Sequence, residues 1–260
     1  MTSSLAVIRP WFRKRECADG IVRVDEPHVH EFLRANIWLI RGETRNLVVD
    51  TGLGVAALRE EVPELFAGDP VLVVTHAHLD HMGSAHEFDV ILAHPAERTD
   101  SPVGDTVVGP LLASQLGLSL GDEAMPEVLL TARPHPDFDP LVHRLRPTPA
   151  TGDLLDGETI DLGDRILTAL HLPGHTSGSL ALYEAKTGAL FSGDVIYDDV
   201  LLDDLHGSDR GAYANSLERL RALPIQTVYP GHGDPFSGER MREIIDAQLR
   251  EWAAMRAPGR

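Results

Sequence analysis

The chain has 260 residues, of which 43% are hydrophobic and 24% charged, which is ordinary usage for a soluble globular protein. Its formal charge of −17 argues against a nucleic-acid partner, because such proteins need a basic face to displace counterions from phosphates. Cys17 is the only cysteine, so no intrachain disulfide can form, and the apolar runs are too short for a signal peptide or a membrane span. We therefore expect a cytoplasmic protein that takes a small-molecule substrate and has no membrane partner.

The first third of the chain is predicted to contain strands and one helix. Apolar, β-branched runs predict strands over residues 21–24, 36–40 and 46–50, which form an antiparallel opening. A helix is predicted over residues 55–65. Residues 71–75 form a fully apolar run, as expected for a strand buried on both faces, and a cluster of histidines follows it directly.

The middle of the chain is less regular than its ends. After a strand at 90–93, the pattern lapses over about 95–149, which predicts either a lid or substrate-binding insertion or a plain surface excursion. Regular structure then resumes as a hairpin-like segment, three strands and two amphipathic helices: 157–164, 165–171, 179–183, 189–192, a helix through Tyr213, Leu217 and Leu220, and a helix from Met241 to Trp252. We expect a single domain over residues 1–260 that contains this insertion.

Four candidate metal ligands occur within six residues at the end of the strand predicted over 71–75. His76 and His78 are two residues apart, so on an extended chain their imidazoles leave on the same side. Asp80 and His81 follow as the chain turns into a helix, and they offer a carboxylate and a third imidazole. This density of ligands predicts a metal site.

Three further candidate ligands each lie beside a glycine and follow a strand, predicted over 166–172, 189–192 and 226–229 respectively: His175, Asp194 and His232. If these strand ends meet at one edge of a sheet, five histidines and two carboxylates converge there. The other histidines that we weighed are interpreted as structural rather than ligating, because a single histidine is more often a satisfied polar group: His86, His94, His135, His143 and His171.

The order of these ligands resembles that of the metallo-β-lactamase-fold hydrolases, whose pattern is His-x-His-x-Asp-His followed by His, Asp and His. The resemblance runs from residues 48–52 to residues 231–233. It implies an α/β fold, an αββα sandwich with the site at one edge of its two sheets. It also implies these roles: His76, His78 and His175 hold one ion, Asp80, His81 and His232 hold a second, and Asp194 bridges the two.

Two divalent ions are therefore the expected cofactors. Zinc suits these nitrogen and oxygen ligands, and manganese or iron would also bind them. Asp50 matches a family position near the site and is expected to orient a ligand. Two such ions lower the pKa of bound water and polarise a carbonyl, which fits hydrolysis of esters, thioesters, lactones and amides. Asp80 is expected to orient the nucleophile and carry a proton. Tyr197 either donates to the oxyanion or packs in the core.

The substrate class rests on a closer likeness. Residues 34–42, 49–54 and 191–198 resemble a subgroup that includes an acyl-coenzyme A thioesterase, so the leading hypothesis is hydrolysis of an acyl-coenzyme A or glutathione thioester. A lactonase or other esterase is the alternative. A persulfide dioxygenase with one iron on His76, His175 and Asp194, and a non-catalytic binding module, are alternatives of other classes. The presence of Asp194 disfavours antibiotic hydrolysis, and a homo-oligomer stays open.

Overall fold

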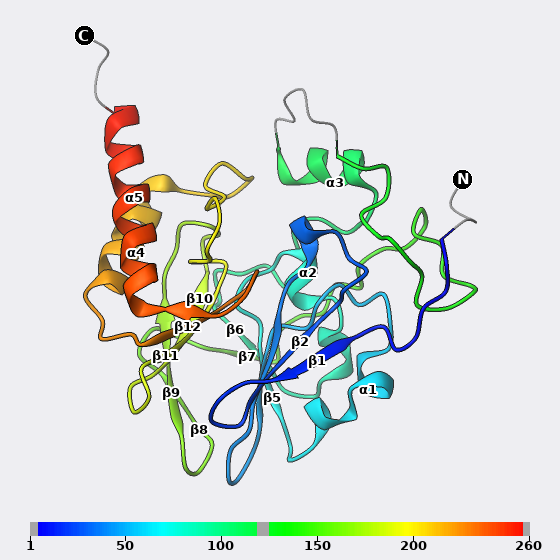
Figure 1. Cartoon of the computed structure of the whole chain (residues 1–260), viewed down its shortest axis with the longest axis horizontal. Helices are drawn as coiled ribbons and strands as arrows, with labels where there is room; N and C mark the ends of the chain where they lie inside the picture. The colour runs from blue at the N-terminus through cyan, green and yellow to red at the C-terminus, as the bar shows by residue number, and fades with distance from the viewer. Residues whose placement is uncertain (1–4, 119–124, 257–260) are drawn as a thin grey trace.

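A computed structural model of the chain describes residues 5–118 and 125–256, and two β-sheets form its centre (Figure 1). The first sheet is antiparallel from β1 to β4 and parallel from β4 to β7. Its strands, in spatial order, are β1 (Arg13–Glu16), β2 (Ile21–Asp25), β3 (Ile37–Ile40), β4 (Leu47–Val49), β5 (Val71–Val73), β6 (Ile91–Ala93) and β7 (Gly152–Asp153).

The second sheet is built from the latter part of the chain. All its neighbouring strands are antiparallel except β11 and β12, which run parallel. Its strands, in spatial order, are β13 (Phe236–Ser237), β12 (Thr227–Pro230), β11 (Ala189–Gly193), β10 (Leu180–Glu184), β9 (Ile166–His171) and β8 (Thr159–Asp161).

The alternation of side chains along each strand builds the layers. Val71 and Val73 of β5 belong to the core between the sheets, whereas Leu72 points into the core on the opposite face. In β11, Phe191 lies between the sheets and Leu190 lies in the outer core. Both faces of these strands are therefore buried, which explains why they read as continuous apolar runs.

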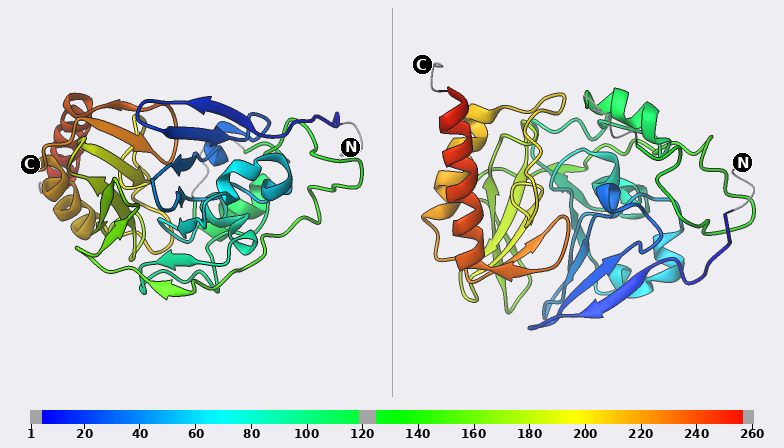
Figure 2. Two further views of the ribbon diagram at one scale, coloured as in Figure 1. Left: turned by 90° about the horizontal axis from the view of Figure 1, so that it is seen from below. Right: turned by 45° about the horizontal axis from the view of Figure 1, so that its top comes forward.

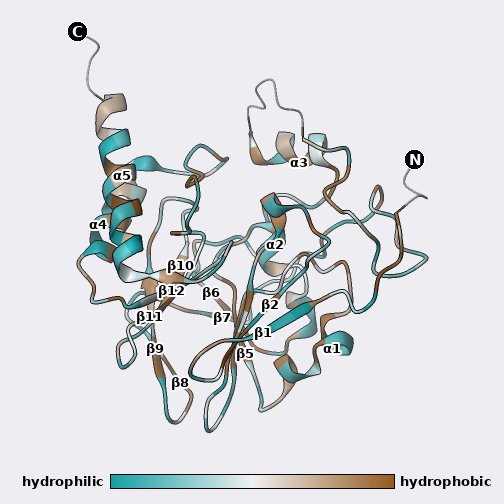
Figure 3. Ribbon diagram, viewed as in Figure 1, coloured by the Kyte–Doolittle hydropathy of each residue, from teal (hydrophilic) through white to brown (hydrophobic). Residues whose placement is uncertain are grey.

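Helices cover the outer face of each sheet (Figure 2). Side chains of α4 and α5 share a core with the second sheet, and side chains of α1, α2 and α3 share one with the first. Along α4 and α5, hydrophilic turns alternate with hydrophobic ones, as Figure 3 shows. The helices are α1 (Leu58–Glu61), α2 (Leu79–Met82), α3 (Gly109–Leu116), α4 (Arg210–Arg221) and α5 (Gly238–Arg256), with short 3-10 turns η2 (Glu31–Leu33), η3 (Pro63–Phe66) and η4 (Ala85–Glu87). The expected αββα sandwich is confirmed.

The local predictions differ from the structure in three places. The helix expected over 55–65 is split into α1 and η3, because Pro63 lacks the N–H that a continuous helix needs. The segment expected to be irregular, 95–149, contains α3, and its residues 119–124 lie outside the described part. Strands β1, β7 and β13 were not anticipated. The single domain over 1–260 stays a prediction, and no helix within 5–118 or 125–256 combines the length and apolar character of a membrane span.

Candidate metal centre

The seven side chains singled out in the sequence meet at one end of the sandwich. His76 and His78 follow β5, and Asp80 and His81 lie in the single turn of α2. The other three ligands follow strands of the second sheet, β9, β11 and β12: His175, Asp194 and His232. Six of the seven are buried, and 17% of the His232 side chain is exposed.

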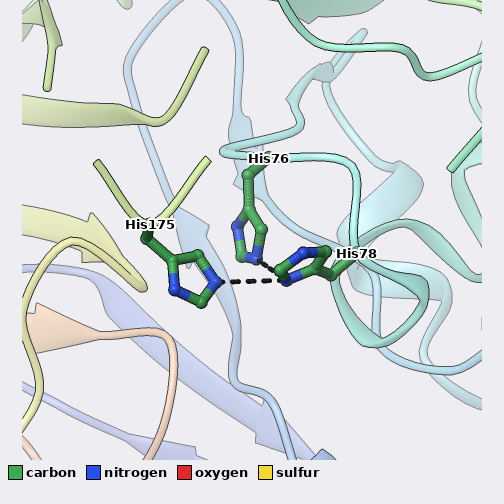
Figure 4. A group of neighbouring side chains, drawn as sticks. All are labelled: His76, His78 and His175. Atoms are coloured by element: carbon green, nitrogen blue, oxygen red, sulfur yellow. Dashed lines mark hydrogen bonds between the residues drawn. The ribbon is translucent and has the colours of Figure 1, made fainter. Parts of the chain in front are cut away.

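Three imidazoles face one another in the first part of the site (Figure 4). The Nδ1 atom of His78 lies 3.1 Å from Nε2 of His76 and 3.1 Å from Nε2 of His175. Ligand atoms about 2.1 Å from a tetrahedral ion lie about 3.4 Å apart, so this spacing is close to that of ligands sharing one ion. The three residues form a group able to hold a metal.

A second group lies beside the first. Nε2 of His232 lies 3.4 Å from Oδ2 of Asp80 and 3.4 Å from Nε2 of His81. Asp80, His81 and His232 also form a group able to hold a metal. Asp194 lies between the two groups, because its Oδ2 is 3.4 Å from Nε2 of His232 and 3.7 Å from Nε2 of His175.

The bonding of Asp194 fits a cation. Among the described residues its Oδ1 atom is buried and has no hydrogen-bond partner, and Nε2 of His81 lies 3.4 Å away. A buried carboxylate oxygen without a donor is costly unless a cation or another group satisfies it. The donor set of imidazoles and carboxylates is also one that zinc, manganese and iron accept. The residues present therefore fit divalent metal.

The charges divide the site into two halves. Burial lowers the pKa of His76 well below its usual value, lowers that of His78 to about 3 and lowers that of His175, so these imidazoles keep their lone pairs. Burial alone would also lower the pKa of His81 and His232. Neighbouring carboxylates, above all Asp194, outweigh this effect of burial. They raise the pKa of His81 well above its usual value and the pKa of His232 to about 9. Without metal, these two imidazoles hold protons that an ion would displace.

Asp50 orients His81 as predicted. Nδ1 of His81 donates to Oδ2 of Asp50 over 2.8 Å, which turns Nε2 toward the centre of the site. The hydroxyl of Thr75 donates to the same carboxylate oxygen and its N–H to Oδ1, both over 2.8 Å. Asp50 is thus held by its own hydrogen bonds while it holds the ligand.

The loop that carries His232 is held by residues that sequence reasoning did not assign to the site. The side-chain amide of Asn36 donates to the carbonyl oxygens of Pro230 and Gly233, both over 2.9 Å. Arg23 in turn donates from Nε to Oδ1 of Asn36 over 2.7 Å and forms an ion pair with Asp234. The signal for Asn36 was present, because it lies in the 34–42 segment that carried the subgroup likeness.

Gly231 has a specific reason to be glycine. A Cβ atom there would lie 2.2 Å from Oδ1 of Asp194 and 2.9 Å from Cε1 of His81. Any side chain would therefore displace two candidate ligands. This explains the glycine before His232 by close approach to the site rather than by a turn.

Tyr197 lines the site, but its hydroxyl already has two partners. It donates to the carbonyl oxygen of Val200 and accepts from the N–H of Leu202, both over 3.0 Å. Burial, with Asp194 nearby, raises the pKa of Tyr197, so the hydroxyl stays protonated. The carbonyl oxygen of Leu202 accepts from Nδ1 of His175 over 3.1 Å, so Tyr197 also supports the segment that orients a candidate ligand.

A cavity of about 510 Å³ opens onto five of the seven residues: His78, Asp80, His175, Asp194 and His232. Seven further lining residues form an apolar wall: Phe32, Leu33, Leu79, Leu116, Val200, Leu202 and Leu205. The exposed lining residues Glu31, Asp198 and Asp199 form an acidic rim. Leu116 comes from α3, and its carbonyl oxygen accepts from the N–H of His206 over 2.9 Å. The 95–149 segment therefore contributes to the cavity wall, which favours the substrate-binding interpretation over a plain surface excursion.

The five histidines interpreted as structural belong to none of the candidate metal groups found among the described residues, which include His76, His81 and Asp194 as a third, overlapping group. Two of them stack on each other, with ring centroids 3.7 Å apart: His94 and His171.

Comparison with known protein families and structures agrees with this fold. Residues 30–232 match the model of the metallo-beta-lactamase superfamily. The acyl-coenzyme A thioesterase MBLAC2 of Homo sapiens is 36% identical over 247 residues, which cover 89% of this chain and 84% of the human protein. The protein of the same name from Gallus gallus is 34% identical over 247 residues, which cover 90% of this chain and 85% of the Gallus gallus protein.

Solved structures resemble the chain in the same way. The metallo-beta-lactamase family protein TTHA1429 from Thermus thermophilus superposes with a TM-score of 0.64 at 20% identity, over 90% of this chain and 80% of its own. The structure of TTHA1623 in a di-iron-bound form superposes with a TM-score of 0.55 at 25% identity, over 82% of this chain and 94% of its own.

Proposed function

The chain belongs to the metallo-β-lactamase superfamily as a metal-dependent hydrolase, and we propose that its substrate is a thioester, such as an acyl-coenzyme A or a glutathione thioester. The observation that carries the proposal is the cavity of about 510 Å³, in which five of the seven candidate ligands line the wall beside apolar side chains. Such a wall suits an acyl chain, whose carbonyl would then lie next to the ligands. The thioesterase name of the relatives at 34–36% identity supports the same substrate.

The proposed cofactor is a pair of divalent ions, with zinc preferred. His76, His78 and His175 would hold one ion and Asp80, His81 and His232 the other, with Asp194 shared. When bound, such ions would lower the pKa of a coordinated water and polarise the carbonyl of the substrate. The di-iron form of TTHA1623 supports two ions, and imidazole and carboxylate ligands accept manganese or iron as well as zinc.

Asp80 and Tyr197 are the proposed catalytic residues. Asp80 is 5% exposed, lines the cavity and carries a carboxylate whose pKa is lowered by His81 and His232 against the opposing effect of burial. It is therefore ionised at neutral pH and able to orient the attacking water and accept its proton. To donate to the oxyanion, Tyr197 must exchange its hydrogen bond to Val200, which is 75% exposed, for one to substrate.

The charge of the cavity restricts how the leaving group binds. Among the described residues that line the cavity, none is Lys or Arg, and Glu31 and Asp199 are exposed at its acidic rim. Asp198, the third residue of that rim, is paired with Arg240. Phosphate groups would be repelled there. A coenzyme A substrate would therefore insert its uncharged pantetheine arm and leave its nucleotide phosphates outside the cavity.

To test the proposal, the purified chain is depleted of metal and then reloaded with zinc, manganese or iron. Each form is assayed for thiol release from octanoyl-coenzyme A and S-lactoylglutathione, for opening of lactones, and for oxygen uptake with a persulfide. We expect metal-dependent thiol release to be the fastest of these reactions. Faster lactone opening, oxygen uptake with one iron per chain, or metal binding without turnover would each contradict the thioesterase proposal.

A further inference from the structure

Glu97 connects the two segments that carry the first group of ligands. It lies four residues after β6, at the start of the 95–149 segment, and its side chain is half-buried. Its Oε2 atom accepts from the N–H of Ala77 over 2.8 Å. Its Oε1 atom accepts from the N–H of Gly178 over 2.8 Å and from the hydroxyl of Thr176.

The partners of this carboxylate lie directly beside the ligands. Ala77 stands between His76 and His78, and Thr176 directly follows His175. One side chain therefore fixes two segments that are about a hundred residues apart in sequence but whose imidazoles must meet. The 3.1 Å between Nδ1 of His78 and Nε2 of His175 depends on how these two segments are spaced.

The surroundings of Glu97 leave it little freedom. A Cβ atom on Gly178 would lie 2.8 Å from Cγ and 2.9 Å from Oε1 of Glu97, so the absence of a side chain there lets the carboxylate approach. The hydroxyl of Thr176 also lies 2.7 Å from Oγ of Ser179, which accepts from the N–H of Thr176 over 3.1 Å. On the other side, the carbonyl oxygen of Ala77 accepts from the N–H of Val103 over 2.8 Å.

We propose that Glu97 is a positioning residue that fixes the spacing of the His76–His78 and His175 segments and thereby sets the affinity of the first metal subsite. It touches neither the cavity nor the candidate ligand atoms, so it acts through the backbone of the ligand segments. The inference rests on the metal site of the proposed function but not on the thioester substrate.

The sharpest test is Glu97→Gln, which keeps the size and shape of the side chain. All three partners donate hydrogen bonds to the carboxylate of Glu97. In a glutamine, the NH₂ group would replace one acceptor oxygen and face a donor, so the hydrogen bond to one of the two ligand segments would be lost. We expect the zinc affinity of the variant to fall roughly 10–100-fold, as is typical when a group that orients ligands is removed. Thr176→Val removes one of the three bonds and is expected to have a smaller effect in the same direction.

The matched control is Asp100→Asn, three residues further on, where an exposed carboxylate accepts from Nε of Arg98. Zinc affinity is measured by competition with a chromophoric chelator, and the melting temperature is measured on the metal-free proteins. We expect Asp100→Asn to bind zinc as the wild type does, and metal-free Glu97→Gln to melt close to the wild type. The visible spectrum of the cobalt-loaded proteins should change for Glu97→Gln only, because it reports the arrangement of the ligands.

The outcomes separate the two levels of inference. A wild-type chain that binds no zinc would overturn the proposed metal site itself. A wild type that binds zinc, together with a Glu97→Gln variant of equal affinity and unchanged cobalt spectrum, would overturn the role of Glu97 alone. A large fall in the melting temperature of the metal-free variant would make Glu97 a general stabilising residue and would also overturn the proposal.

Discussion

Glu26 is a buried carboxyl beside the loop that carries Asp50, and its protonation should be visible in the stability of the chain. It is 1% exposed, its Oε1 accepts from Nε1 of Trp11 and its Oε2 accepts from the N–H of Leu53, both over 2.8 Å. Burial raises the pKa of Glu26 from 4.5 to about 7, against the opposing effect of these two hydrogen bonds.

The sign and size of the effect follow from this pKa. Because the folded chain holds the proton more tightly than the unfolded chain, Glu26 contributes stability that is fully present below pH 4.5 and is lost as the pH rises through about 7. At about 1.4 kcal/mol per pH unit, the interval between these values corresponds to roughly 3 kcal/mol in the free energy of unfolding.

The variant Glu26→Gln removes the titration, and urea unfolding of metal-free wild type and variant at several pH values between 4.5 and 8 measures it. As the pH rises over this range, we expect the free energy of unfolding of the variant to increase by roughly 3 kcal/mol relative to that of the wild type. The loss of one hydrogen-bond acceptor destabilises the variant equally at every pH and does not alter this trend. Glu60→Gln, at an exposed position of α1, is the matched control and should show no comparable change. A difference between wild type and Glu26→Gln that is the same at every pH would refute the reasoning.

Three further changes test the site. Asp194→Ala should lose bound metal and activity together, measured by elemental analysis and thiol release, and unchanged occupancy and rate would refute its bridging role. Tyr197→Phe should lower kcat by about 10²-fold if the hydroxyl serves the oxyanion, whereas a loss confined to thermal stability would make Tyr197 an anchor of the segment through Leu202. Raising the ionic strength should increase kcat/KM for octanoyl-coenzyme A and leave that for octanoyl-pantetheine unchanged, because salt screens the acidic rim; equal salt dependence would place the phosphates elsewhere.

Much of the fold could be predicted because apolar runs and turns mark the strands. The strands expected at 21–24, 36–40 and 46–50 correspond to β2, β3 and β4, and the hairpin-like segment corresponds to β8 paired with β9. β1 was missed because its four residues, Arg13 to Glu16, are all charged and exposed, so no apolar signal marks an edge strand of this kind. β7 contains only Gly152 and Asp153, which is too short for any periodicity.

In the site, likewise, the candidate ligands could be predicted from the sequence, whereas the residues that hold them in place could not. The seven candidate ligands have distinctive residue types in a specific order, and the structure brings them together. Glu97 carries no such signal, because it is one of 40 acidic residues and stands in a segment without regular pattern. Its importance arises from long-range hydrogen bonds to Ala77 and Gly178, which only the folded chain creates. The apolar wall of the cavity was likewise hidden, because Leu116 and Leu202 meet there only through tertiary structure.

The central claim is that metal bound by these seven residues hydrolyses a thioester. Its most direct test is a titration of the metal-free chain with zinc in which bound metal and thiol release from octanoyl-coenzyme A are followed in the same samples. We expect turnover to rise with occupancy and to level off at two zinc ions per chain. Full turnover without metal, or two bound zinc ions with no thiol release, would contradict the account.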